Sequence, residues 1–254
     1  MSLSQCIEGE DVRFLNGSLH FVFQPIFDLS NKVRAYEALA RCQFYKDGVS
    51  LKNGFTPIGI ENIPFPVQVK AFIGSILSFK NLGSAVQNAR FFLNVNSSAF
   101  NRHNMAILAE ALLDYNLSPN SIGIEITEHQ TLCGIDCSVM EAMRVAGFEI
   151  ALDDFGSGFS NIESVVQLPF NSVKFDRSFL YMYKSELGAS LFNSLHSSIK
   201  NVGIKTVIEG VETALMFQDA VALGPTCLQG YFLGKELCTT SPAIKFKGKN
   251  NYAV

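Results

Sequence analysis

Short apolar segments alternate with helix-like segments over most of the chain, and this alternation constrains the fold more than any other feature. The apolar segments span residues 91–95, 122–126, 148–152, 172–175, 204–208 and 227–230. Apolar residues recur at helical spacing over residues 67–82, 105–114, 139–146, 186–202 and 214–223. Strands that alternate with helices in this way form βαβ units, which build a largely parallel sheet.

Two more strands are predicted before the first of these helices. Leu19–Ile26 and Val33–Leu39 are separated by turn-like residues at 29–32, so we expect them to form a hairpin. With the six later strands they make eight. We therefore predict an α/β fold, a modified (β/α)8 TIM-type barrel with an antiparallel first strand. Residues 43–67, rich in Gly, Pro and Asn, are expected to form an insertion or a loop near a site.

Composition excludes several classes of protein. The 22 Phe and the low charged fraction of 17%, against about 25% in a typical domain, exclude disorder. With 20 basic and 23 acidic residues and no basic block, a long nucleic acid is not an expected partner. No apolar run approaches the ~18 residues of a membrane span, and no secretory signal is evident, so we expect a cytoplasmic protein. Without a linker-like segment, residues 1–254 are expected to form one domain with no separate sensor domain.

Polar residues stand at or just past the end of nearly every predicted strand. They are Glu37, Asn96, Glu125, Asp153, Asp154, Lys174, Asp176, Glu209 and Gln229. In a barrel the C-terminal strand ends converge on one face, where active sites are built. A single carboxylate after a strand is more often a solvated loop residue. Several carboxylates crowded together would repel one another unless a cation neutralises them, so the pattern predicts a metal site.

The ligand types indicate which metal. Carboxylates and an amide oxygen, without His or Cys, suit Mg²⁺ or Mn²⁺ rather than zinc or copper. The adjacent Asp153 and Asp154 could let one carboxylate bridge two ions while its neighbour holds the second, as in two-metal phosphoester displacement. Lys174 could orient water and offset charge on a pentavalent phosphate. The residues alone therefore predict metal-dependent hydrolysis of a phosphate ester.

The sequence motifs in these segments resemble those of the EAL domain family, bacterial phosphodiesterases that act on cyclic di-GMP. The matching motifs are FQPI at 23–26, YEALAR at 36–41, LNVNSS at 93–98, IEITE at 124–128, ALDDFGSGF at 151–159, VKFDRSF at 173–179, VIEGVET at 207–213 and QGYF at 229–232. Their order and spacing agree with the family from about residue 19 to 237. The resemblance implies hydrolysis of cyclic di-GMP to linear pGpG, with two ions of Mg²⁺ or Mn²⁺ activating water.

The resemblance also assigns roles to single residues. It implies that the first metal is held by Glu37, Asn96, Glu125 and Asp153, and the second by Asp153, Asp154 and Glu209. Lys174 would position or activate the attacking water, with Glu209 as a further candidate for base work. A substrate phosphate would be clamped by Arg41, whose guanidinium fork suits phosphate oxygens. The nucleotide pocket would be lined by Gln24, Leu39 and Gln229, and the site would be supported by Asp176 and Glu212.

The loop after the fifth strand, residues 155–161, carries the expected dimer contact. The resemblance implies that Glu128 anchors this loop and that the protein is a homodimer. Its glycines permit conformational switching, so we interpret the loop as a hinge between metal binding and dimer contacts. A regulatory protein partner in place of a sensor domain stays open.

The sequence departs from the family pattern in a few places. Residues 42–66 do not follow it, which leaves one wall of the pocket undefined, and Glu236 replaces a common proline, with little expected effect on chemistry. Two alternative functions are compatible with parts of this pattern. A silent relative would bind cyclic di-GMP or a protein partner without turnover, and a barrel lyase or isomerase would use a Lys base with Mg²⁺. Retention of every expected metal and catalytic position favours the phosphodiesterase.

Overall fold

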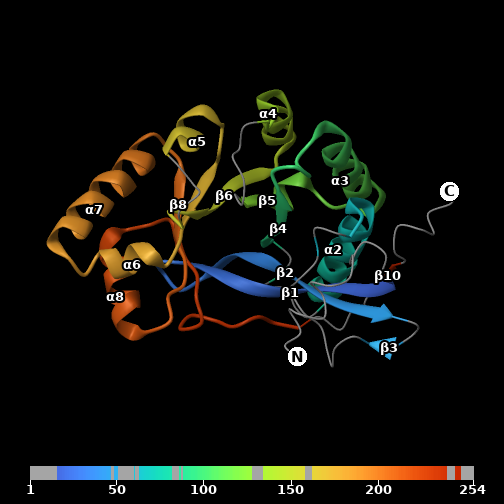
Figure 1. The fold of residues 1–254 in the computed structure, drawn as a ribbon, viewed down its shortest axis with the longest axis horizontal. Helices are drawn as coiled ribbons and strands as arrows, with labels where there is room; N and C mark the ends of the chain where they lie inside the picture. Colours follow the sequence, from blue (N-terminus) through green and yellow to red (C-terminus); the bar gives the residue numbers. More distant parts are fainter. Residues whose placement is uncertain are drawn as a thin grey trace.

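Eight strands close into a mixed barrel with helices on its outside, in a computed structural model (Figure 1). The structure describes residues 16–46, 49–50, 60, 63–81, 86, 88–127, 134–157, 162–238 and 244–246. The barrel strands are β1 (Asn16–Asp28), β2 (Val33–Lys46), β4 (Arg90–Asn96), β5 (Ile122–Thr127), β6 (Glu149–Phe155), β7 (Ser172–Phe175), β8 (Lys205–Ile208) and β9 (Cys227–Leu228). They follow the order β1-β9-β8-β7-β6-β5-β4-β2, and the pairing of β1 with β2 closes the ring. The predicted fold class is confirmed.

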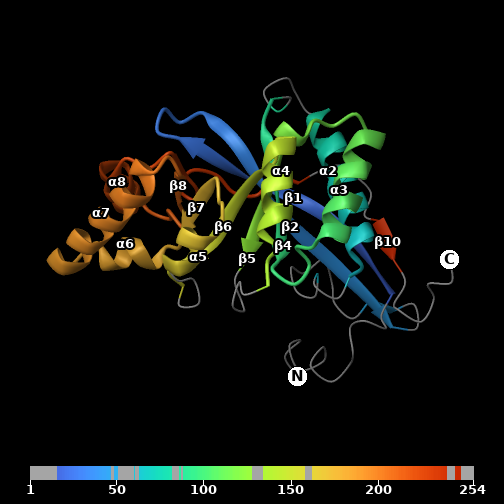
Figure 2. The same ribbon diagram turned by 90° about the horizontal axis from the view of Figure 1, so that it is seen from above.

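The predicted hairpin is present and longer than expected. β1 and β2 pair antiparallel from Asn16 opposite Tyr45 to Phe27 opposite Val33. At the turn, the Asp28 carboxylate accepts hydrogen bonds from the backbone of Ser30 and Lys32, both at 2.9 Å. The other end of the hairpin extends beyond the barrel, where β3 (Val49–Ser50) and β10 (Ile244–Phe246) pair with its two strands (Figures 1 and 2).

The orientation of β1 distinguishes this barrel from a fully parallel one. β2 pairs parallel with β4, and the pairs from β4 to β9 are all parallel. β1 is antiparallel to both of its neighbours in the ring, as predicted. Its contact with β9 is short, with only Phe27 opposite Leu228 and Asp28 opposite Cys227 in register. The barrel therefore has a narrow seam between β1 and β9.

The expected helices are present, with ends close to those predicted. They are α2 (Phe65–Lys80), α3 (Arg102–Asp114), α4 (Cys137–Ala146), α7 (Glu186–Asn201) and α8 (Ala214–Leu223). Two short helices, α5 (Ile162–Gln167) and α6 (Ser178–Met182), and the 3-10 turn η4 (Pro119–Ser121) were not predicted, because segments of this length show no clear helical period. Among the described residues, no helix combines the length and the apolar character needed to span a bilayer.

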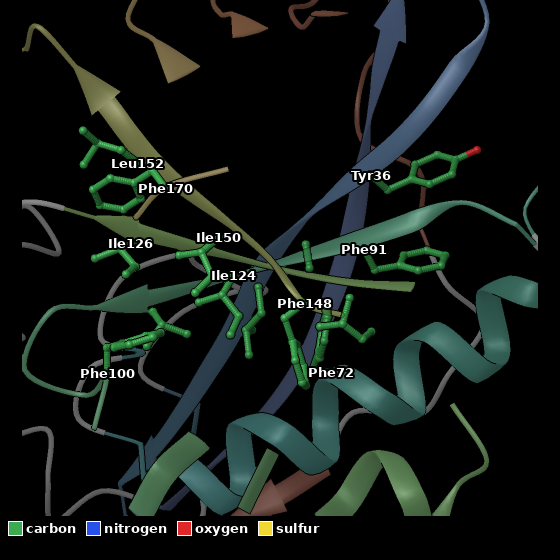
Figure 3. Close-up of a cluster of buried hydrophobic side chains, with 14 of the residues drawn as sticks. Tyr36, Phe72, Phe91, Phe100, Ile124, Ile126, Phe148, Ile150, Leu152 and Phe170 are labelled. Carbon is green, nitrogen blue, oxygen red and sulfur yellow. The ribbon is translucent and has the colours of Figure 1, made fainter. Parts of the chain in front are cut away.

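Successive side chains of each strand face alternately the inside and the outside of the barrel, which creates two apolar regions. The larger region lies between the strands and the surrounding helices, where Phe72 of α2 points toward Ile124, Phe148 and their neighbours (Figure 3). Tyr36 and Phe91 stack in this region, with ring centroids 5.6 Å apart. A smaller cluster of Ile26, Ala35, Phe92, Ala151 and Val207 fills part of the barrel interior. Because neighbouring residues in a strand face opposite sides, Glu37 and Asn94 point into the barrel.

Candidate active site

A single lysine lies among four carboxylates inside the barrel. Lys174 is 1% exposed, and its strand neighbours Val173 and Phe175 face the helices. Its Nζ lies 2.7 Å from Glu209 Oε1 and 2.9 Å from both Asp153 Oδ1 and Glu125 Oε2. Glu37 Oε2 follows at 3.4 Å. Four carboxylates from four parts of the chain thus share one ammonium group, and we call these five residues the lysine cage.

Two amide side chains hold Glu37 in the lysine cage. Asn94 Nδ2 donates to Glu37 Oε1 at 2.9 Å, and Gln229 Nε2 donates to Glu37 Oε2 at 2.7 Å. The amide oxygens of Asn94 and Gln229 are buried and accept no hydrogen bond from the described residues. Neither oxygen of the fully buried Glu125 accepts one either, although Lys174 lies within ion-pair distance. Such buried oxygens are the atoms that a hard cation coordinates.

Asn94 was missed by the sequence analysis, which selected Asn96 on the same strand face. In the parallel register Asn94 lies beside Glu125, whereas Asn96 lies beside Thr127. Asn96 has no hydrogen bond to the lysine cage among the described residues, but its amide oxygen is buried and without a hydrogen bond like that of Asn94, and both asparagines line a separate cavity of about 250 Å³. The alternation of the strand could not distinguish the two asparagines, because both face inward. The register against the neighbouring strand places Asn94 beside one carboxylate of the lysine cage, that of Glu125.

The two consecutive aspartates lie on the same side of β6. Oxygens of Asp153, Asp154 and Glu209 all lie within 4.8 Å of one another. Neighbouring residues in a regular strand point to opposite faces, but here the register against β7 shifts between Leu152 and Phe155. Asp154 has a φ of 51°, an uncommon value for a residue other than glycine. This irregularity brings both carboxylates to the mouth of the barrel.

Burial and crowding shift the ionisation of these groups. Burial raises the pKa of Glu125 and of Glu209 well above the usual range. Burial and the neighbouring Asp153 raise the pKa of Asp154 to about 6. Burial alone would lower the pKa of Lys174, but Asp153 and the other carboxylates around it raise this pKa well above its ordinary value. Lys174 therefore keeps its proton, whereas burial and crowding oppose the simultaneous ionisation of all the carboxylates around it.

The donor set fits a divalent cation. It consists of carboxylate and amide oxygens, with no imidazole or thiol among the described residues of the cluster, which is the set preferred by Mg²⁺ and Mn²⁺. A divalent cation would also favour the ionised form of the carboxylates that hold it.

A cavity of about 490 Å³ opens above the lysine cage and contains most of the predicted site. Its lining includes Gln24, Glu37, Leu39, Asp153, Asp154, Lys174, Asp176, Glu209, Glu212 and Gln229. Arg177 and Tyr231 also line it and were not selected from the sequence. Glu125 is absent from this lining; together with Lys174 it borders a second cavity of about 390 Å³ on the opposite side. The lysine cage therefore separates two cavities inside the barrel.

The predicted supporting residues have defined contacts. Asp176 Oδ1 accepts the backbone N–H of Ser178 at 2.9 Å, at the start of α6. Glu212 pairs with Arg177, with Oε1 3.2 Å from Nη1. Gln24 Nε2 donates to the backbone oxygen of Gly234 at 3.4 Å. Glu128 lies outside the described residues, as do residues 158–161 of the predicted hinge and most of the atypical segment 42–66.

Comparison with protein families gives a match over most of the chain. A family model described as "EAL domain" matches residues 11–236. The chain belongs to the EAL domain family. This confirms the resemblance drawn from the motifs and places the lysine cage in the matched region of this EAL domain.

Named relatives and solved structures agree with this assignment. Cyclic di-GMP phosphodiesterase RocR of Pseudomonas aeruginosa is 26% identical over 242 residues, covering 93% of this chain and 61% of RocR. This EAL domain spans only 30% of the bifunctional diguanylate cyclase/cyclic di-GMP phosphodiesterase MucR of the same organism. Among solved structures, Klebsiella pneumoniae BlrP1 in a manganese/cyclic di-GMP complex has a TM-score of 0.71 at 24% identity, covering 90% of this chain and 58% of that one. The fold is thus shared with an EAL protein that binds both a metal and the nucleotide.

Proposed function

We propose that this EAL domain hydrolyses cyclic di-GMP to linear pGpG, as a metal-dependent, cyclic-guanylate-specific phosphodiesterase. The observation that carries the proposal is the lysine cage, with Asp154 beside it at the mouth of a cavity. Families of this fold support many chemistries, so the function rests on the site and not on the barrel. The names of relatives such as RocR support the choice of substrate.

Two ions of Mg²⁺ or Mn²⁺ are proposed to occupy the site. One would be held by Glu37, Asn94, Glu125 and Asp153, and the other by Asp153, Asp154 and Glu209. The amide oxygens of Asn94 and Asn96 are both buried and accept no hydrogen bond from the described residues; we propose Asn94 in place of Asn96 because its side chain also donates to Glu37 of the lysine cage. When bound, such ions lower the pKa of water and stabilise charge on phosphoryl oxygens.

The remaining chemistry belongs to side chains of the chain itself. Lys174 keeps its proton, so it would donate a hydrogen bond to the attacking water or to a phosphate oxygen rather than act as a base. Glu209 lines the cavity and lies 2.7 Å from Lys174 Nζ, so its carboxylate would be within reach of a water held by Lys174 and would accept the proton of that water. Gln24, Leu39 and Gln229 would contact the nucleotide, and Arg41 a phosphate. A homodimer and a regulatory protein partner remain proposals supported by the family resemblance.

Product analysis tests the proposal. Purified protein is incubated with cyclic di-GMP and Mg²⁺ or Mn²⁺, and the nucleotides are separated by anion-exchange chromatography. We expect linear pGpG from the native protein, and at least about 100-fold less from Glu37→Ala, Lys174→Ala and the conservative Glu209→Gln. Glu141→Gln, on the exposed surface of α4, is the matched control and should retain activity.

A silent receptor would give a different result. If folded, metal-loaded protein binds cyclic di-GMP without forming pGpG, as measured by calorimetry beside the product assay, the phosphodiesterase proposal is wrong and the receptor takes its place. If neither binding nor turnover occurs, both are wrong.

A further inference from the structure

Arg41 is engaged by a carboxylate in this EAL domain. Its Nη2 donates to Glu236 Oε1 at 3.0 Å, and its Nη1 donates to the backbone oxygen of Ala40 at 3.0 Å. The hydroxyl of Tyr231, which lines the candidate cavity, donates to the same Glu236 oxygen at 3.3 Å. The Arg41 and Glu236 side chains are 21% and 25% exposed. Residues 195 positions apart thus meet beside Tyr231 of the cavity lining, although neither of them lines the candidate cavity itself.

The backbone fixes Glu236 in this position. We call residues 231–237 the post-β9 segment. Leu237 exchanges two backbone hydrogen bonds with Phe23 of β1, at 3.0 and 2.8 Å. Earlier in the segment, the backbone oxygen of Gly234 accepts from the Gln24 side chain, and a Cβ added at Gly234 would lie 2.7 Å from Pro25. The segment is therefore attached to β1 on both sides of Glu236, which holds the backbone of Glu236 beside that strand.

An anionic ligand and Glu236 would compete for the same guanidinium group. Arginine binds phosphate through paired N–H groups, and one N–H on each terminal nitrogen of Arg41 already donates elsewhere. A phosphate that reaches Arg41 must also approach the Glu236 carboxylate, and like charges at this range repel. Glutamate at this position departs from the family pattern, and little effect on chemistry was expected from it. The ion pair gives Glu236 a role that the sequence did not predict.

We propose that Glu236 is an affinity-setting residue that competes with a substrate phosphate for Arg41. The inference rests on the proposed function, because it takes the phosphodiester to be the ligand of Arg41. It predicts that the chain binds its substrate more weakly than the same chain without the carboxylate. It also predicts that this difference depends on salt, since ionic screening weakens contacts between partly exposed charges.

The test compares Glu236→Gln with the native protein. Glutamine keeps the shape and a hydrogen-bond acceptor for Tyr231 but removes the charge. The matched control is Glu141→Gln on α4, where a glutamate also pairs with an arginine, Arg144, at 3.1 Å. The Kd for cyclic di-GMP is measured by calorimetry in EDTA, and kcat and KM are measured with Mg²⁺. An Arg41→Ala variant, alone and combined with Glu236→Gln, completes a double-mutant cycle.

We expect Glu236→Gln to lower Kd and KM about three- to tenfold and to leave kcat within about twofold of the native value. The substitution removes both the ion pair with Arg41 and the repulsion between Glu236 and a substrate phosphate, and both affect binding rather than the chemical step. This gain in affinity for cyclic di-GMP should decrease at high salt, disappear in the Arg41→Ala background and be absent from Glu141→Gln. Equal or weaker binding by Glu236→Gln would overturn the competition and show instead that Glu236 positions Arg41. If Glu236→Gln gives this result while the native protein binds cyclic di-GMP, the inference about Glu236 is wrong and the proposed function is unaffected. If no variant binds the nucleotide with or without metal, the proposed function fails as well.

Discussion

Replacement of Lys174 by methionine tests how charge is balanced inside the barrel. Methionine keeps an unbranched stem of similar length and removes the ammonium group. Four carboxylates at 2.7 to 3.4 Å then lose their shared cation. Removing one partner of a buried ion pair costs about 3–5 kcal/mol. Since about 1 kcal/mol moves the Tm of a chain of this size by about 2–4 °C, we expect a fall of about 6–20 °C in metal-free protein.

Lys205→Met is the matched control. Lys205 lies on the adjacent strand β8 and pairs with a single carboxylate, Glu149, at 2.8 Å. Its side chain is 50% exposed, and pairs of this kind contribute about 0–1 kcal/mol, so the Tm should fall by less than about 4 °C.

Differential scanning calorimetry in EDTA, repeated with Mn²⁺, provides the measurement. We expect the difference between Lys174→Met and native protein to narrow with Mn²⁺, because the ion supplies the positive charge that the variant lacks. A Lys174→Met protein that melts within about 4 °C of the native protein in EDTA, as the control does, would refute the reasoning. The carboxylates would then be balanced by their own protons rather than by the lysine.

Three further predictions concern the metal ligands, their protonation and the backbone beside them. Asn94→Ala should weaken Mg²⁺ binding about 10- to 100-fold and Asn96→Ala less than about threefold, by calorimetry; the reverse order would restore Asn96 as the ligand. The pKa of Asp154 is raised from 3.8 to about 6, so without metal the free energy of unfolding should decrease as the pH rises through this interval. Because a cation competes with that proton, Mg²⁺ affinity should fall about tenfold from about pH 7 to about pH 5, and a pH-independent affinity would contradict the pKa. Gly230→Ala should cost at least about 2 kcal/mol more than Gly203→Ala in urea unfolding, because only the Cβ at Gly230 meets backbone, at 2.2 Å; equal costs would show that the backbone adapts.

Most of the barrel could be predicted because its signals are local. Each strand and each long helix carries its own hydrophobic period, and the turn at residues 29–32 carries its own turn chemistry. The helices α5 and α6 were missed because five or six residues do not complete enough turns to show a period. The general position of the site followed from the rule that strand ends of a barrel converge.

Contacts between distant residues could not be predicted in the same way. A period of two assigns Asn94 and Asn96 to one face, and the choice between them depends on the register against β5. The pairing of Arg41 with Glu236 depends on how the post-β9 segment attaches to β1. The cavity beneath the lysine cage depends on small side chains, such as Ala35 and Ala151, that meet only when the ring closes. Each of these features arises from strand register or ring closure, which no single segment encodes.

The narrow seam between β1 and β9 has a consequence for the breathing of the molecule. Regions held by few backbone hydrogen bonds open first in sub-global fluctuations, and here two residue pairs join β9 to β1. Gln229 follows β9 directly and bonds across the interior to Glu37 of β2, on the other side of β1. A ligand bound at Glu37 would therefore link β9 to β2 across this short contact of the ring. The free energy of ligand binding would then stabilise the contact between β1 and β9, and hydrogen exchange of the backbone amides there would slow when the site is occupied. Occupancy of the site and closure of the barrel would thus be thermodynamically coupled.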